Sequence, residues 1–390
     1  MKQRLAVIAA IIGFGCLAQQ AVAQTSTSGA NTISTAVPFL SIAPDSRAGA
    51  MGDAGVATSP DMNSQHWNPA KYAFIESELG VGLSYTPWLR NLVDDINLAY
   101  LAGYKKLDDM QTLSASLLYF SLGEITFMDN FGNYQGLQNP NEFAVDLAYT
   151  RLLSDQFSGS VALRYIRSDL TGGQLINGVE SHAGTSFAAD IAFYYRNEMR
   201  VNRKESVFSA GVNISNIGNK ISYTDGITKD FIPTNLRLGA AYETELDQYN
   251  TLTFAVDLNK LLVPTPTPAS IDADGVIVGG GFSQDKSVVG GMFSSFSDAP
   301  GGFKEELQEV NISMGLEYWY NRQFALRAGY FYEHENKGNR KFLTAGAGLK
   351  LNVFTLDFSY LLPTERNHPL ENTLRFSLSF DFEEFSNQRR

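Results

Sequence analysis

Residues 374–382 read Leu-Arg-Phe-Ser-Leu-Ser-Phe-Asp-Phe, so every even-numbered position is apolar and every odd-numbered position is charged or hydroxylic. A β-strand turns successive side chains to opposite faces. One face of this strand is therefore wholly Leu and Phe, and the other is polar. The apolar face of a single strand of this kind could pack against a soluble core or face lipid. The pattern in the rest of the chain distinguishes these two possibilities.

The same pattern of about ten residues recurs along nearly the whole chain, which favours lipid. Glycine (34 residues), tyrosine (18) and an aromatic share of 12% suit strands, tight turns and interfacial belts. We predict an all-β fold, a 14-stranded antiparallel transmembrane β-barrel over residues 79–382. Its strands are expected near 79–88, 95–105, 111–122, 142–153, 157–169, 184–196, 206–217, 234–245, 251–261, 308–320, 322–333, 341–350, 352–360 and 371–382.

The connections between these strands alternate in length. Compact ones such as 154–156 and 246–250 alternate with long ones at 123–141, 170–183, 218–233 and 262–307. Outer-membrane barrels keep periplasmic turns short and extracellular loops long, and an even number of strands returns both chain ends to the periplasm. We therefore expect the long segments to face the cell surface and residues 383–390 to form a periplasmic C-terminal tail.

The N-terminus has the features of a secretory signal peptide over residues 1–23. Lys2 and Arg4 precede an apolar core, and Ala21-Val22-Ala23 is a small-residue cleavage site. The only cysteine, Cys16, lies in the removed segment, although lipidation of Cys16 is an alternative. No later stretch has the roughly 18 consecutive apolar residues of a transmembrane helix. The net charge of −11 argues against nucleic acid as a partner, because phosphates bind Lys and Arg.

Residues 24–78 precede the first strand and read as a flexible arm followed by a plug. The part from 39 to 57 is rich in small residues and has no strand or long-helix periodicity. Ser59-Pro60-Asp61 resembles a helix start with proline at the first helical position. Small residues allow close backbone packing, so we predict that this segment fills the base of the barrel. The alternative is a loop-rich cap outside it.

The predicted lumen face carries charges of both signs. An open ion-selective pore would more commonly show one sign at a constriction. We therefore expect these residues to pair, to fix the barrel and to anchor the plug; they are Asp146, Asp190, Arg237, Glu243, Asp257, Glu317, Arg327, Asp357, Arg375 and Asp381.

The longest loop, 262–307, combines a stiff proline repeat with a glycine-rich apolar stretch. Loops longer than about 15 residues are usually functional or disordered, and exposed apolar surface normally has a partner. We interpret the loop as reaching into another protein; folding over the barrel mouth as a lid is the alternative. The residues that carry this interpretation are Pro264, Pro266, Pro268, Val276, Val278, Phe282, Met292, Phe293 and Phe296.

The sequence supports no enzymatic site. We predict no catalytic, cofactor-binding or metal-binding residues, because the four histidines are not at ligand spacing and no nucleophile elbow or phosphate loop is present. An outer-membrane lipid A deacylase would require a Ser–His pair, and the pattern offers none.

The plug sequence closely resembles the PorV family, outer-membrane components of the Bacteroidetes type IX secretion system that are related in fold to the FadL fatty-acid transporters. The resemblance lies in the run 42–55 followed by 67–70, and Lys71 replaces the glycine that ends the similar FadL element. The matching positions are Pro44, Asp45, Arg47, Gly49, Met51, Gly52, Gly55, Asn68, Pro69 and Ala70.

The resemblance implies a non-enzymatic, FadL-like barrel in the outer-membrane bilayer and its lipopolysaccharide. It further implies that the protein binds cargo C-terminal signal domains at a large translocon barrel of the SprA or Sov type. It would then shuttle this cargo to a surface attachment complex of the PorU and PorZ type. The segment 262–307 is the candidate for contact with the translocon. The alternative function is a FadL-like passive transporter of hydrophobic small molecules.

Overall fold

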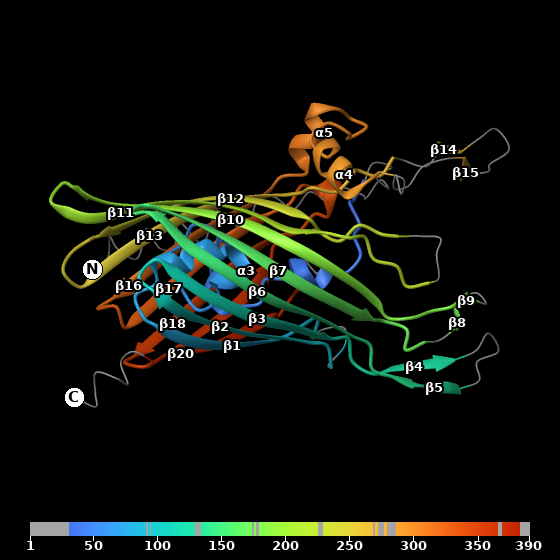
Figure 1. Cartoon of the computed structure of the whole chain (residues 1–390), viewed down its shortest axis with the longest axis horizontal. Helices are drawn as coiled ribbons and strands as arrows, with labels where there is room; N and C mark the ends of the chain where they lie inside the picture. Colours follow the sequence, from blue (N-terminus) through green and yellow to red (C-terminus); the bar gives the residue numbers. More distant parts are fainter. Residues whose placement is uncertain are drawn as a thin grey trace, which may run out of the picture. The chain divides into compact units, whose positions relative to one another are not determined.

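The computed structural model describes residues 31–382 apart from 91–92, 94, 129–133, 174, 177–178, 225–228, 268–269, 272–276, 279–285 and 366–368. The predicted signal peptide and C-terminal tail, and residues 24–30 of the predicted arm, lie outside the described residues. Within residues 31–382 the strands surround a set of short helices near the N-terminus (Figure 1).

Fourteen strands form one closed antiparallel barrel. The first and last strands close it, in a register that runs from Gly80 opposite Asp381 to Tyr85 opposite Phe376. The predicted fold class is confirmed. The strands are β1 (Leu79–Pro87), β2 (Asn97–Asp108), β3 (Gln111–Ser121), β6 (Asn141–Ser154), β7 (Phe157–Asp169), β10 (Gly184–Val201), β11 (Lys204–Gly218), β12 (Asn235–Glu245), β13 (Asn250–Leu261), β16 (Asn311–Tyr320), β17 (Phe324–Tyr332), β18 (Lys341–Leu351), β19 (Phe354–Pro363) and β20 (Leu374–Asp381).

The two faces of the barrel differ as the sequence alternation requires. Large apolar side chains such as Leu163, Phe187 and Leu326 are exposed on the outside, whereas Arg164 and Asp190 are buried inside. Closure pairs each of the fourteen barrel strands with two neighbours, so the barrel leaves no strand edge to face lipid. Among the described residues, none of the helices is both long and apolar enough to cross a bilayer.

The two ends of the barrel are built differently. At the turn end, the connections 109–110, 155–156, 202–203, 246–249, 321–323 and 352–353 are short. In the turn after β10, Asn202 and Arg203 have φ of 51° and 66°, the left-handed conformation that matches the twist of a two-residue hairpin. At the loop end, longer connections carry the small sheets β4 (Ile125–Met128) with β5 (Tyr134–Gln138), β8 (Leu175–Ile176) with β9 (Val179–Glu180), and β14 (Ser270–Ile271) with β15 (Ile277–Val278) (Figure 1).

Most strand boundaries differ from the sequence prediction by a few residues, and three differences change the description of the long loop, of a turn and of the plug. The strand expected from residue 308 begins at Asn311, because helix α5 (Phe303–Gln308) occupies the preceding residues, so the long loop spans 262–310. The connection expected over 197–205 is a two-residue turn between longer strands. No helix starts at Ser59-Pro60-Asp61; α3 (Ser64–Trp67) starts later, and Ser59 instead accepts hydrogen bonds from Arg47.

Residues 37–75 form the plug inside the barrel (Figure 1). Its elements are the 3₁₀ helix η1 (Pro38–Ser41), α2 (Ser46–Ala50), α3 and the 3₁₀ helix η2 (Pro69–Phe74). The plug is bonded to opposite walls: Thr344 on β18 donates to the Ala50 carbonyl, and Ser158 on β7 donates to the Ala70 carbonyl.

The two ends of the lumen are filled in different ways. Near the loop end, Phe39 and Leu40 of the plug pack into an apolar cluster with inward side chains of the wall such as Leu98, Phe120 and Ile166. Toward the turn end, the plug meets the wall through buried charges. The first contact is hydrophobic burial, whereas the second depends on exact pairing of charges.

Candidate functional site

The helix α2 of the plug begins with a buried cap. Asp45 is the N-cap of α2: one carboxylate oxygen accepts from the Ala48 amide at 2.9 Å, and the other accepts from the Trp67 indole at 2.7 Å. Burial, reinforced by the nearby Asp61, raises the pKa of Asp45 to about 6. The residue therefore ties the first half of the plug to α3 through a single side chain.

Arg47 on α2 makes a bidentate ionic link between plug and wall. Its Nε and Nη2 donate to the two oxygens of Glu317 on β16, at 2.9 and 2.7 Å. Its Nη1 donates to Asp61 at 2.9 Å, and Ser59 accepts twice more. Burial by itself would raise the pKa of Asp61, but the positive charges of Lys71 and Arg47 lower it. Bidentate pairs of this kind fix orientation as well as adding energy.

The ion pairs continue along the wall. Glu317 also accepts from Arg327 on β17 at 2.6 Å, and Arg327 donates to Asp357 on β19 at 2.6 Å. Asp61, Arg47, Glu317, Arg327 and Asp357 therefore form one chain of alternating charge that crosses from the plug into three strands. Removing one member of such a buried set leaves a charge without its partner, which is costly.

Three glycines of the motif mark close approaches. A Cβ on Gly52, whose φ is +68°, would lie 2.6 Å from the backbone of Tyr330. A Cβ on Gly55 would lie 2.5 Å from the Trp67 ring, and one on Gly49 would lie 2.7 Å from Arg375. Glycine is required here by space, and at Gly52 also by backbone conformation. Met51 is fully buried between these positions and packs on Ala241 and Ala255.

The second half of the motif is bonded to the opposite wall. The Asn68 side chain caps η2 by accepting from the Ala70 amide, and it donates to the Val56 carbonyl and to Phe193 on β10. Thr150 on β6 donates to the Pro69 carbonyl at 2.9 Å. This half is fixed mostly through backbone groups, which explains why short residues suffice there.

Lys71 is the position at which the motif departs from the FadL-type element. Its ammonium is buried and donates to the Gly55 carbonyl at 2.8 Å and to Thr58 at 3.1 Å. Burial lowers the pKa of Lys71, while the negative charge of Asp61 opposes that change. The lysine therefore joins the two halves of the plug, a role the sequence did not indicate.

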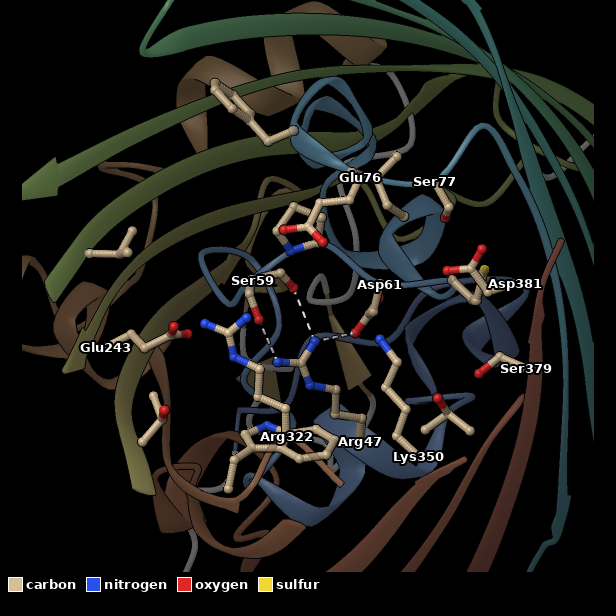
Figure 2. A pocket seen from close by; sticks show the side chains of 18 of the residues that line it. Arg47, Ser59, Asp61, Glu76, Ser77, Glu243, Arg322, Lys350, Ser379 and Asp381 are labelled. Carbon is tan, nitrogen blue, oxygen red and sulfur yellow. Dashed lines mark hydrogen bonds and ion pairs between the residues drawn. The ribbon is translucent and has the colours of Figure 1, made fainter. Parts of the chain in front are cut away.

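A polar vestibule lies between the plug and the turn end. It is a cavity of about 620 Å³; Figure 2 shows Arg47 in it, bonded to Ser59 and Asp61. Glu205 and Glu243 line it from β11 and β12, whereas Arg322 and Lys350 line it from the region of β16–β18. The mixture of signs on its walls gives no single preference for anions or cations.

The long loop has a fixed base and an exposed apolar outer part. Lys260 on β13 pairs with Glu306 at 2.9 Å and with Glu309 at 2.6 Å. Lys337 pairs with Glu305 at 2.6 Å and with Glu309 at 2.9 Å. These buried pairs hold α5 against the barrel wall.

The exposed apolar residues of the loop lie on and beside α4 (Val288–Ser294) and α5. Phe293 and Phe303 are 76% and 78% exposed. The surfaces of soluble proteins seldom leave large aromatic rings exposed to this extent. We call the exposed set the α4–α5 segment; it consists of Val289, Phe293, Phe296, Phe303 and Leu307.

The predicted loop residues separate into groups. Pro264 and Pro266 are buried beside the barrel, so the proline stretch does not project at these positions. Phe293 and Phe296 are exposed, and Met292 is half-buried. Val278 lies in β15. Pro268, Val276 and Phe282 lie outside the described residues. The prediction missed Val289, Phe303 and Leu307, whose exposure depends on two short helices that the sequence pattern did not reveal.

The geometry defines the class of protein: an antiparallel barrel with an apolar outer face and an N-terminal plug bonded into its lumen. Solved structures of similar fold include the Pseudomonas putida toluene transporter TodX (13% identity, covering 85% of this chain and 96% of that one, TM-score 0.49). Another is a Pseudomonas aeruginosa FadL homologue (9% identity, covering 88% and 99%, TM-score 0.45). A search of curated proteins finds no match.

Residues 25–268 match the family model described as Type IX secretion system protein PorV. This range covers more than half of the chain, so the chain belongs to the PorV family. It is thus an outer-membrane component of the type IX secretion system. The match includes the plug, whereas α4 and α5 lie beyond it.

Proposed function

We propose that this protein receives cargo at the translocon of the type IX system, through the cargo C-terminal signal domain, and shuttles it to the surface attachment complex. In this proposal the barrel is a non-catalytic docking unit whose loop end faces the cell surface. The α4–α5 segment contacts the translocon barrel. Membership of the PorV family supports the general role, and the loop supports the contact.

The proposed contact with the translocon is supported by one observation: the exposed apolar α4–α5 segment stands on a base that is held in place. The pairs of Lys260 and Lys337 with Glu305, Glu306 and Glu309 hold α5 in place. Phe293 and Phe303 nevertheless remain exposed. A pre-ordered apolar surface loses little conformational entropy on binding and gains affinity by burial. A lid over the barrel would instead bury these rings against the chain itself.

The alternative function, passive transport of hydrophobic small molecules, needs a continuous apolar path through the lumen. Phe39 and Leu40 fill the apolar part of the lumen with the chain's own side chains. The plug residues beyond them are bonded to both walls. These contacts weigh against a transporter that works without moving its plug.

The test is mild-detergent purification of the tagged protein from its native membrane, with mass spectrometry of its partners. We expect a very large barrel protein and secreted proteins that share a C-terminal domain. Phe293→Glu combined with Phe303→Glu should remove the large barrel protein while the variant still folds. Leu137→Glu on β5, also an exposed apolar position at the loop end, is the matched control and should keep it.

Two outcomes would contradict the proposal. Retention of the large barrel protein by the double variant would remove the α4–α5 segment as the contact. A solitary barrel that carries fatty acid or another hydrophobic ligand would favour the transporter.

A further inference from the structure

The outer face of the barrel carries an apolar groove over β10–β13. Its volume is about 440 Å³, within the range of roughly 300–1,000 Å³ typical of ligand sites. Ala210 and Ala240 lie opposite each other on β11 and β12 and form its floor. Phe193, Leu238 and Leu258 rise beside them and are exposed. The groove lies near the middle of these strands.

The wall behind the groove is in close contact with the plug. A Cβ on Gly211 would lie 2.5 Å from the Val56 carbonyl oxygen, and one on Gly239 would lie 2.9 Å from the Val56 side chain. Asp257 on β13 accepts from the Gly55 and Val56 amides at 2.7 and 2.9 Å. The backbone of β11 and β12 thus lies directly against the plug at this place, and the small outward residues Ala210 and Ala240 leave the space on the outer face unfilled.

The lining has no polar group left to bind. All of its residues are apolar, aromatic or glycine. The two tyrosine hydroxyls are already used: Tyr194 donates to Ser209 at 3.0 Å, and Tyr195 donates to Gln156 at 3.3 Å. A polar head group or a charged peptide would therefore find no partner in the groove, whereas a hydrocarbon chain needs none.

We propose that this groove binds one acyl chain of a bilayer phospholipid. It is continuous with the apolar outer face of an outer-membrane barrel, so acyl chains reach it directly. A chain seated over Ala210 and Ala240 contacts walls on both sides, whereas a chain on a convex part of the barrel contacts one surface only. These additional dispersion contacts retain an acyl chain in the groove longer than an acyl chain elsewhere on the barrel surface.

The test uses the folded protein in phosphatidylethanolamine–phosphatidylglycerol vesicles that contain a trace of phosphatidylethanolamine with a photoreactive acyl chain. After irradiation, mass spectrometry should find more label on peptides of β10–β13 than on peptides of β17–β19. Ala240→Phe fills the groove and should abolish that excess. Ala328→Phe places the same ring on the exposed outer face of β17 and should leave it unchanged.

Ala210→Leu provides a second filling variant if Ala240→Phe fails to fold, and it should have the same effect. Equal labelling around the barrel would overturn the proposal. It would also be overturned if both filling variants kept the excess label. If Ala240→Phe no longer co-purifies with the translocon barrel but keeps the excess label, the groove would be assigned to a protein contact instead. Loss of the label alone leaves the proposed function untouched.

Discussion

The plug and the α4–α5 segment are both irregular parts of the chain held by buried ion pairs, but they differ in what they leave exposed. Arg47 and its partners fix the plug, which buries nearly every side chain between residues 43 and 57. Lys260 and Lys337 fix α5, while Phe293 and Phe303 stay exposed. Ionic anchoring by itself therefore does not distinguish a structural element from a binding element. The exposed apolar surface makes that distinction.

The strongest test of this comparison removes the anchor of the plug. Arg47→Ala removes the ion-pair partner of Asp61 and leaves Glu317 with Arg327 alone, and we expect the free energy of unfolding to fall by about 3–5 kcal/mol. Arg322→Ala, an exposed arginine of the vestibule, should change it by less than about 0.5 kcal/mol. Urea unfolding in detergent, followed by tryptophan fluorescence, measures both. Equal midpoints for the two variants would show that the plug does not depend on this cluster.

The glycines provide a matched pair between the two regions. Gly52 and Gly302 have φ of +68° and +67°, but only Gly52 has backbone within reach of an added Cβ. Gly52→Ala should cost about 3 kcal/mol through strain and overlap. Gly302→Ala introduces backbone strain without steric overlap. Because Gly302 directly precedes α5, this variant should lower the local stability of α5 only. Urea midpoints and hydrogen exchange separate these effects, and a larger loss for Gly302→Ala would reverse the comparison.

Lys71 tests whether the departure from the FadL-type element stabilises the plug. Lys71→Met removes the donor to the Gly55 carbonyl and to Thr58, and we expect a loss of about 1–3 kcal/mol. Lys350→Met changes an exposed lysine of the vestibule and should be nearly neutral. A cysteine introduced at the buried Ala54 should react with thiol reagents faster in Lys71→Met. An unchanged reaction rate would mean that the lysine is dispensable for plug position.

The smallest expected effect is a difference in pH response between the two regions. Burial alone would raise the pKa of Glu305, but hydrogen bonds from Lys337, Gly301 and Asn31 lower it below its usual 4.5. The stabilisation from Glu305 is therefore complete above pH 4.5 and is lost as the pH falls through the lowered value. The contribution of Asp45 to stability changes with pH in the opposite direction. Its pKa is raised to about 6, so its folded form gains stability as the pH falls from 6 toward 3.8.

Hydrogen exchange at pH 7, 5 and 3.5, corrected for intrinsic rates, checks this difference. Residues 303–308 should lose protection only at the lowest pH, whereas residues 46–51 should gain protection between pH 7 and 5. A parallel response of both regions would contradict the assigned causes.

The sequence by itself determined the barrel. Alternation of apolar and polar residues specifies which face of each strand meets lipid, and the lengths of the connections specify which strands are neighbours. All fourteen strands were predictable for this reason, apart from boundaries such as Asn311, where a short helix precedes the strand. The plug motif was also visible, because its small residues break both periodicities.

Only the tertiary structure decided what the motif residues bind. Arg47 pairs with Glu317 across 270 positions of sequence, and Gly55 with Asp257 across 202. No local pattern encodes these partners, because they depend on the register in which the barrel closes around the plug. The same holds for the exposure of Phe293 and Phe303. The sequence pattern around an apolar loop residue is the same whether the fold buries the residue or leaves it exposed.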